Sequence, residues 1–115
     1  MTDMLKAGCA IAVVLMTAGV ASAQNQAQID GGQKAFTDQK CVICHSIAGK
    51  GNAKGSLDGV GSKLSAAEIR EWIVDAPAMT AKAKAARQPP MKAFTSLAEA
   101  DLDALVAYLQ SLTKK

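Results

Sequence analysis

The sequence predicts an all-α domain. Two stretches, residues 63–77 and 96–115, combine helix-start signals with apolar residues at helical spacing, whereas no segment alternates convincingly as a strand does. In the second stretch, Ser96 and Glu99 offer an S-x-x-E capping box ahead of an apolar stripe. That stripe consists of Leu102, Leu105, Val106, Leu109 and Leu112.

The chain opens with the pattern of a secretory signal. Lys6 precedes a charge-free apolar run, and the run ends in a small-residue A-x-A site at residues 21–23. We expect cleavage after Ala23, which makes residues 1–23 a signal peptide, residues 24–115 the mature domain, and the periplasm its compartment. If the segment stayed uncleaved, it would anchor the protein in a membrane.

The mature chain is expected to begin with a helix over residues 30–40, opened by Asp30. Gly31 and Gly32 are poor helix formers, and tolerated glycines of this kind usually mark the close approach of another element. Residues 47–63 are rich in glycine and predict a long loop, which in a small domain indicates a function or a wrap around something.

The helix in residues 63–77 has the clearest boundaries. Ser65 and Glu68 form its capping box, and Pro77 ends it. Residues 78–87 predict a shorter, weakly amphipathic helix, which the following Gln-Pro-Pro-Met sequence breaks. One face of the helix in residues 63–77 carries Ile69, Trp72 and Ile73.

Composition excludes several classes of function. The net charge is +3, without an arginine cluster or a long block of like charges, so nucleic-acid binding is not expected. The chain has a single histidine and no recognisable acid–base pair. We therefore expect neither an enzyme nor a small-molecule substrate.

Cys41, Cys44 and His45 form a C-x-x-C-H motif, the pattern of covalent haem attachment, in which both thiols bond to one porphyrin and the histidine binds its iron. A zinc site would be one ligand short. A thioredoxin-like C-x-x-C motif would need a βαβ context. A disulfide between residues so close would close a tiny loop and stabilise little. Haem is the interpretation that uses all three residues.

The mature chain resembles the small monohaem class I c-type cytochromes. The resemblance rests on a first helix with Gly32 and Phe36, the C-x-x-C-H motif, the segment GSLDGVGSKL, a helix with Trp72, a Pro-Met loop and the terminal LVAYLQSL. It implies three to five helices wrapped around one covalently attached haem c. It also implies that the first and last helices cross at a glycine, so that Gly32 and Phe36 meet the face of Leu105, Tyr108 and Leu109.

The resemblance further implies that His45 and a methionine ligate the iron, since a thioether is a soft donor that suits haem. Outside the signal, the candidates are Met79 and Met91. Met91 follows Pro89 and Pro90, which hold the backbone extended. Met79 begins a predicted helix, where a methionine is more often core filler. We therefore predict ligation by His45 and Met91.

The segment after the motif should support the histidine. In the family, a proline carbonyl accepts the bond from the ligating imidazole, and Ser56 is expected to supply that carbonyl here. Leu57 and Val60 would line the haem. Trp72 would either donate its indole N–H to a haem propionate or serve as an ordinary core residue.

These features predict an exported electron carrier that cycles Fe(III) and Fe(II) between redox proteins. An open-site haem enzyme or gas sensor, and a haem subunit docked in a larger oxidoreductase, remain as alternatives. The lysines around the motifs would either form solvated faces or a weak docking patch for acidic partner surfaces. They are Lys40, Lys50, Lys54, Lys63, Lys82, Lys84 and Lys92.

Overall fold

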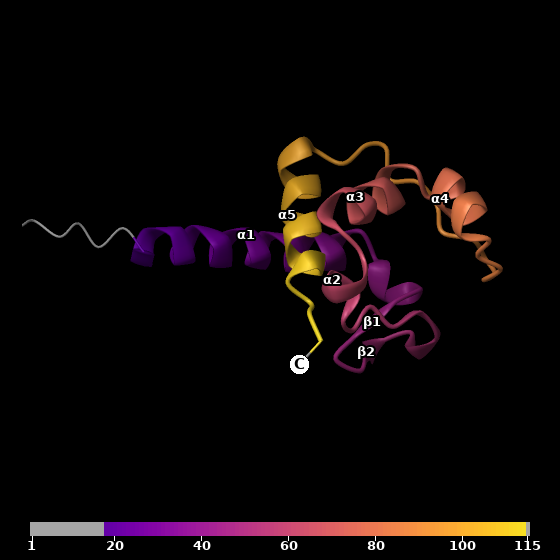
Figure 1. Cartoon of the computed structure of the whole chain (residues 1–115), viewed down its shortest axis with the longest axis horizontal. Coiled ribbons are helices and arrows are strands. Elements are labelled where there is room, and N and C mark those ends of the chain that lie inside the picture. Colours follow the sequence, from indigo (N-terminus) through magenta and orange to yellow (C-terminus); the bar gives the residue numbers. More distant parts are fainter. Residues whose placement is uncertain (1–17, 115) are drawn as a thin grey trace, which may run out of the picture.

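The computed structural model describes residues 18–114, which fold into an all-α domain with one very small β-hairpin (Figure 1). The helices, including the short 3₁₀ turns η1 and η2, and the strands follow one another as α1 (Ala18–Asp38), η1 (Cys41–Ile43), β1 (Ser46–Ile47), β2 (Lys50–Gly51), η2 (Ala53–Gly55), α2 (Val60–Lys63), α3 (Ala66–Val74), α4 (Ala76–Ala83) and α5 (Glu99–Gln110). The predicted fold class is confirmed.

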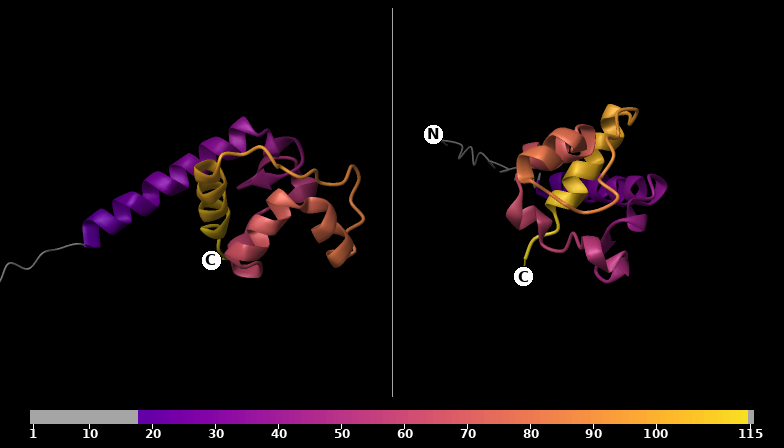
Figure 2. Two further views of the ribbon diagram at one scale, coloured as in Figure 1. Left: turned by 90° about the horizontal axis from the view of Figure 1, so that it is seen from above. Right: turned by 90° about the vertical axis from the view of Figure 1, so that its right-hand side faces the viewer.

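Helices α1 and α5 cross at Gly32, as the resemblance implied (Figures 1 and 2). A Cβ on Gly32 would lie 2.5 Å from Cβ of Tyr108 and 2.7 Å from the carbonyl carbon of Ala104. No side chain fits there, so glycine alone allows the two backbones to touch. One turn further along α1, the ring of Phe36 packs edge-on against Tyr108 with 6.1 Å between their centroids.

A single apolar core forms where α1, α3 and α5 meet. Leu97, Leu112 and several other half-buried apolar residues pack around it. The predicted stripe of the last helix points inward, and so do two residues on the face of α3. The buried members are Ala35, Phe36, Ile69, Ile73, Leu102, Leu105, Val106 and Leu109.

Helix α3 starts at the predicted capping box. Glu68 N–H donates to Ser65 Oγ at 3.2 Å, and Ser65 N–H donates to Glu68 Oε1 at 3.1 Å. Pro77 ends this helix by occupying the first turn of α4, where a missing N–H costs nothing. On its outer face, Arg70 pairs with Glu99 and, at 2.8 Å, with Asp103, which ties α3 to α5.

Several predicted helix boundaries are wrong. The helix predicted over residues 78–87 already ends at Ala83, and the last helix ends at Gln110. The first helix does not begin at Asp30, because α1 already runs from Ala18 through an Ala- and Gln-rich stretch without proline. The capping box predicted at Ser96 and Glu99 does not form, because the N-cap of α5 is Ala98, which makes no side-chain cap. The chain stays extended before Glu99, and this lets Leu97 pack on the core.

The predicted signal peptide lies mostly outside the described residues. The predicted cut after Ala23 falls within α1. Residues 18–114 contain no helix with the length and apolar character needed to cross a membrane.

The glycine-rich loop is more ordered than predicted. Strands β1 and β2 pair antiparallel, with Ile47 opposite Lys50. The residues between them, Ala48 and Gly49, both have positive φ, at 52° and 79°. Positive φ at both positions is what a tight two-residue hairpin turn requires. The hairpin shapes the segment directly after the C-x-x-C-H motif.

Candidate functional site

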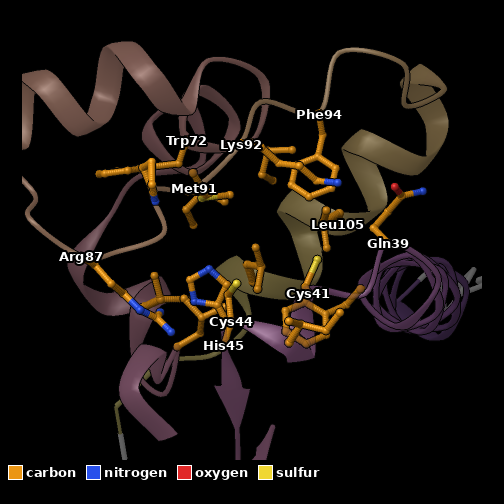
Figure 3. Close-up of a pocket in the computed structure, with 18 of the residues that line it drawn as sticks. Gln39, Cys41, Cys44, His45, Trp72, Arg87, Met91, Lys92, Phe94 and Leu105 are labelled. Carbon is orange, nitrogen blue, oxygen red and sulfur yellow. The ribbon is translucent and has the colours of Figure 1, made fainter. Parts of the chain in front are cut away.

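A cavity of about 650 Å³ opens between the C-x-x-C-H segment, α3, α5 and the connection from α4 to α5. Its walls include Cys41, Cys44, His45 and Met91, which are the four residues predicted to hold haem (Figure 3). The first three come from one segment and Met91 from another, far along the chain. The fold therefore brings all the predicted site residues to one cavity.

The two cysteines are presented by the 3₁₀ turn η1. Lys40 precedes it in the left-handed conformation, and His45 N–H donates to the Cys41 carbonyl at 2.9 Å. Both thiols are half-buried, and no disulfide joins them. Burial raises the pKa of the Cys41 thiol, so it stays protonated near neutral pH. Both thiols are thus available for covalent attachment of a ligand.

The motif does not gather around a single metal-ion position. In the part of the chain that the structure describes, no three His, Cys, Asp or Glu side chains converge as metal-ion ligands would. In Figure 3, Cys41 lies apart from Cys44 and His45 along the cavity wall. Such a spread suits one large planar group better than a zinc ion.

The imidazole of His45 is oriented by a backbone carbonyl. Its Nδ1 lies 2.9 Å from the Gly55 carbonyl oxygen, which leaves Nε2 as the nitrogen available to a metal. Burial lowers the pKa of His45 and the positive charge of Arg87 lowers it further, against the opposing effect of the Gly55 bond. The neutral, ligating form is therefore favoured.

The prediction that the Ser56 carbonyl accepts the hydrogen bond from His45 is wrong by one residue, because the acceptor is the Gly55 carbonyl. Turn η2 ends at Gly55, and the Gly55 carbonyl is hydrogen-bonded to the His45 ring. The chain then pairs with β1, where Leu57 N–H donates to the Ser46 carbonyl at 2.9 Å. That pairing fixes Ser56 beside Ser46 and away from the imidazole.

Sequence reasoning missed Asn52, which fastens the motif to the loop. Its side-chain amide donates to the Ile43 carbonyl at 3.1 Å, and its backbone N–H donates to the carbonyls of Val42 and His45. Its side-chain oxygen caps η2 by accepting from Lys54 N–H at 3.0 Å. An asparagine within a glycine-rich segment was the available signal, because asparagine commonly stabilises turns through its side chain.

Met91 and Met79 occupy different surroundings. Met91 lines the cavity from the wall facing His45 (Figure 3). Met79 is 7% exposed in α4 and does not line this cavity. Pro89 and Pro90 also line it, and after Met91 the Phe94 N–H donates to the Ile73 carbonyl at 2.8 Å. The connection that carries Met91 is therefore held against α3.

The family model for cytochrome c matches residues 29–113, which is most of the chain and includes every residue of the cavity. The chain belongs to the cytochrome c family. It is a haem electron-transfer protein and carries covalently attached haem c.

The cavity of this cytochrome fits that group. Two thiols lie on its wall, the imidazole leaves one nitrogen free, and a thioether faces it from the opposite side. The predicted lining by Leu57 and Val60 is confirmed, and Trp72 lines the cavity as well. Further apolar walls come from Phe36, Leu64, Ile69, Ile73, Phe94, Leu105 and Leu109.

One relative of this cytochrome is cytochrome c oxidase subunit 2 of Alkalihalophilus pseudofirmus. It is 28% identical over 90 residues, which cover 70% of the chain. The match spans only 25% of that relative's length. No solved structure gives a significant match.

Proposed function

We propose that this cytochrome is an exported one-electron carrier, with haem bonded to Cys41 and Cys44 and ligated by His45 and Met91. The observation that carries the proposal is the apolar cavity, in which His45 and Met91 lie on facing walls. No other methionine of the described residues lines it. A filled sixth position suits a carrier, whereas a haem enzyme or gas sensor needs an open one.

When bound, haem c supplies the reversible change between Fe(III) and Fe(II). The chain's own residues set the conditions for that change. Gly55 holds the His45 ring in one orientation. Pro89 and Pro90 restrict the backbone just before Met91, although the chain bends at Gln88 and Pro89 and is not extended there as predicted. The apolar walls keep water away from the iron. Ligands that need not move between oxidation states keep the cost of electron transfer low.

The cavity rim offers a docking surface for redox partners. Ile43 is 65% exposed and Val42 39% exposed, beside the cysteines. Lys40 and Lys92 are exposed and line the cavity. An apolar centre with a cationic rim suits a partner with an acidic face, which would be steered by charge and held weakly. The other predicted lysines are also exposed and would add to the long-range field.

Export follows from the predicted signal peptide. The protein secreted to the periplasm should begin at Gln24, which intact-mass measurement of the mature holoprotein tests directly. A mass that includes residues 1–23 would indicate a membrane-anchored carrier and not a freely diffusing one.

A second candidate function is that of a haem subunit docked in a larger oxidoreductase. It is favoured by the similarity to an oxidase subunit in which the matched region is one quarter of the length. The two candidates differ in solution: a carrier purifies as a free monomer, whereas a docked subunit co-purifies with a partner after mild extraction.

Absorption spectroscopy of the purified holoprotein tests the proposal. A carrier with histidine and methionine ligands should show sharp reduced α and β bands and a weak long-wavelength sulfur-to-iron band when oxidised, and it should not bind CO. Rapid CO binding by the reduced protein would instead support the open-site enzyme or sensor.

A further inference from the structure

Arg87 is a charged side chain of the cavity wall for which the ligand scheme above gives no role. It lies in the connection between α4 and Met91, is half-buried, and reaches toward the segment of Cys44 and His45 (Figure 3). The ion pairs of the described residues involve Lys34 and Arg70, and none involves Arg87. A guanidinium in the cavity wall without a carboxylate partner is free to pair with an anionic group of a ligand.

Gly55 makes room for this guanidinium. A Cβ at Gly55 would lie 3.0 Å from Cζ of Arg87 and would overlap its Nη1 and the Cys44 carbonyl oxygen. The same glycine presents its carbonyl to the imidazole of His45. Arg87 thus reaches from the segment that carries Met91 to the loop that orients His45, along one edge of the cavity.

The charge of the cavity points to an anionic ligand group. Three cations line it, namely Lys40, Arg87 and Lys92, and no Asp or Glu of the described residues does. Lys40 and Lys92 are exposed, and the ammonium of Lys92 lies over the Phe94 ring at 5.2 Å from its centroid. Arg87 alone is half-buried, and its planar fork matches a carboxylate in two parallel hydrogen bonds.

We propose that Arg87 binds one propionate carboxylate of the haem and thereby positions the haem edge between the two ligand-bearing segments. The proposal rests on the placement of haem in this cavity. It makes Arg87 a cofactor-positioning residue that also tunes the redox equilibrium, and it excludes docking of an acidic partner as the residue's main role.

The first test compares Arg87→Gln with Lys82→Gln in the holoprotein. Lys82 is exposed in α4 and does not line the haem cavity, so its variant removes the same charge elsewhere. In the unaltered protein, the paired propionate stays ionised and adds no pH dependence to the midpoint potential. Without Arg87 this carboxylate takes up a proton between about pH 5 and 8. Its ionised form then favours Fe(III), so the potential of Arg87→Gln should fall as pH rises and end below that of the unaltered protein.

Lys82→Gln should show no new pH dependence. Equal potentials and pH profiles in both variants would overturn the proposal. So would a slower reaction of Arg87→Gln with an acidic redox partner at an unchanged potential, since that result assigns Arg87 to docking. The long-wavelength sulfur band is recorded in the same samples, and it tests Met91 ligation independently of Arg87.

Two further measurements keep the proposal testable if Arg87→Gln loses its haem. Arg87→Lys retains the charge and should show the same pH profile of the potential as the unaltered protein, and a new pH dependence in this variant would count against a charge pair. Redox-induced infrared difference spectra of the unaltered holoprotein should show at least one propionate that stays ionised down to about pH 5. Protonation of both propionates above that pH would overturn the proposal.

Discussion

Gly31 and Gly32 are neighbours in α1, yet replacing them with alanine should have opposite effects on stability. A Cβ on Gly32 would lie 2.5 Å from Tyr108 Cβ and still closer to the Ala104 carbonyl oxygen. A Cβ on Gly31 would lie 3.7 Å from the side chain of Ala104, an ordinary contact. The two sites share a helix and a substitution, so only the approach of α5 distinguishes them.

The magnitude follows from the separation that α1 and α5 would need. Restoring the ordinary contact distance of 3.4 Å at Gly32 requires the helices to move apart by roughly 1 Å. A gap of that size forfeits about a quarter to a half of each contact's attraction, including that between Phe36 and Tyr108. We expect a loss of about 3 kcal/mol, against about 1 kcal/mol regained from helix propensity.

Thermal unfolding of the holoproteins, followed by circular dichroism, measures both effects. With about 4–8 °C per kcal/mol for a domain of this size, Gly32→Ala should lower Tm by about 10 °C or more. Gly31→Ala should raise Tm by about 4–8 °C, because alanine is the better helix former. Equal shifts of the same sign in the two variants would refute the close-approach argument.

Three other predictions concern the capping box, the core and the haem linkage. Ser65→Ala should cost about 1 kcal/mol in guanidinium unfolding at neutral pH. The Ser65 backbone N–H, which this variant keeps, lowers the pKa of Glu68, so the benefit of that bond is present above the ordinary value of 4.5 and is lost as pH falls through the lowered pKa. The deficit of Ser65→Ala comes from the lost Oγ cap on the Glu68 N–H, which does not titrate, so a deficit that vanishes well below pH 4.5 would contradict the box. Phe36→Ala should lose about 3–5 kcal/mol in the same assay, and a loss below about 1 kcal/mol would show that the α1–α5 contact is not part of the core. Cys41→Ala combined with Cys44→Ala should abolish haem that resists acid-acetone extraction, and a folded, haem-retaining double variant would disprove covalent attachment.

The parts of the fold that sequence analysis predicted correctly have local signals. Ser65 and Glu68 specify a helix start by themselves, and the C-x-x-C-H motif specifies its ligand within five residues. The Gly32 crossing came from resemblance to a family, together with the cost of a glycine inside a helix. In the capping box and the motif, the determining residues are close in sequence. Gly32 can be recognised because a glycine inside a helix is costly unless another element packs against it.

The missed features depend on contacts between distant segments. Whether the carbonyl of Gly55 or of Ser56 meets His45 is decided by the hydrogen bond from Leu57 to Ser46, which no motif encodes. The same holds for Arg87, whose direction depends on the space that Gly55 leaves across the cavity. The box at Ser96 failed because burial of a neighbouring leucine outweighed a capping signal worth about 1 kcal/mol.

The identity of the sixth ligand tests the account most directly, through the spectra and potentials of Met91→Ala and Met79→Ala. Met91→Ala should lose the long-wavelength sulfur band of the oxidised protein, bind CO when reduced and have a lower midpoint potential, because a thioether ligand raises it. Met79→Ala should retain the band and lose only stability, by about 2–5 kcal/mol, since Met79 is a buried side chain outside the cavity. Loss of the band in Met79→Ala with its survival in Met91→Ala would contradict the assignment of His45 and Met91 as the ligand pair.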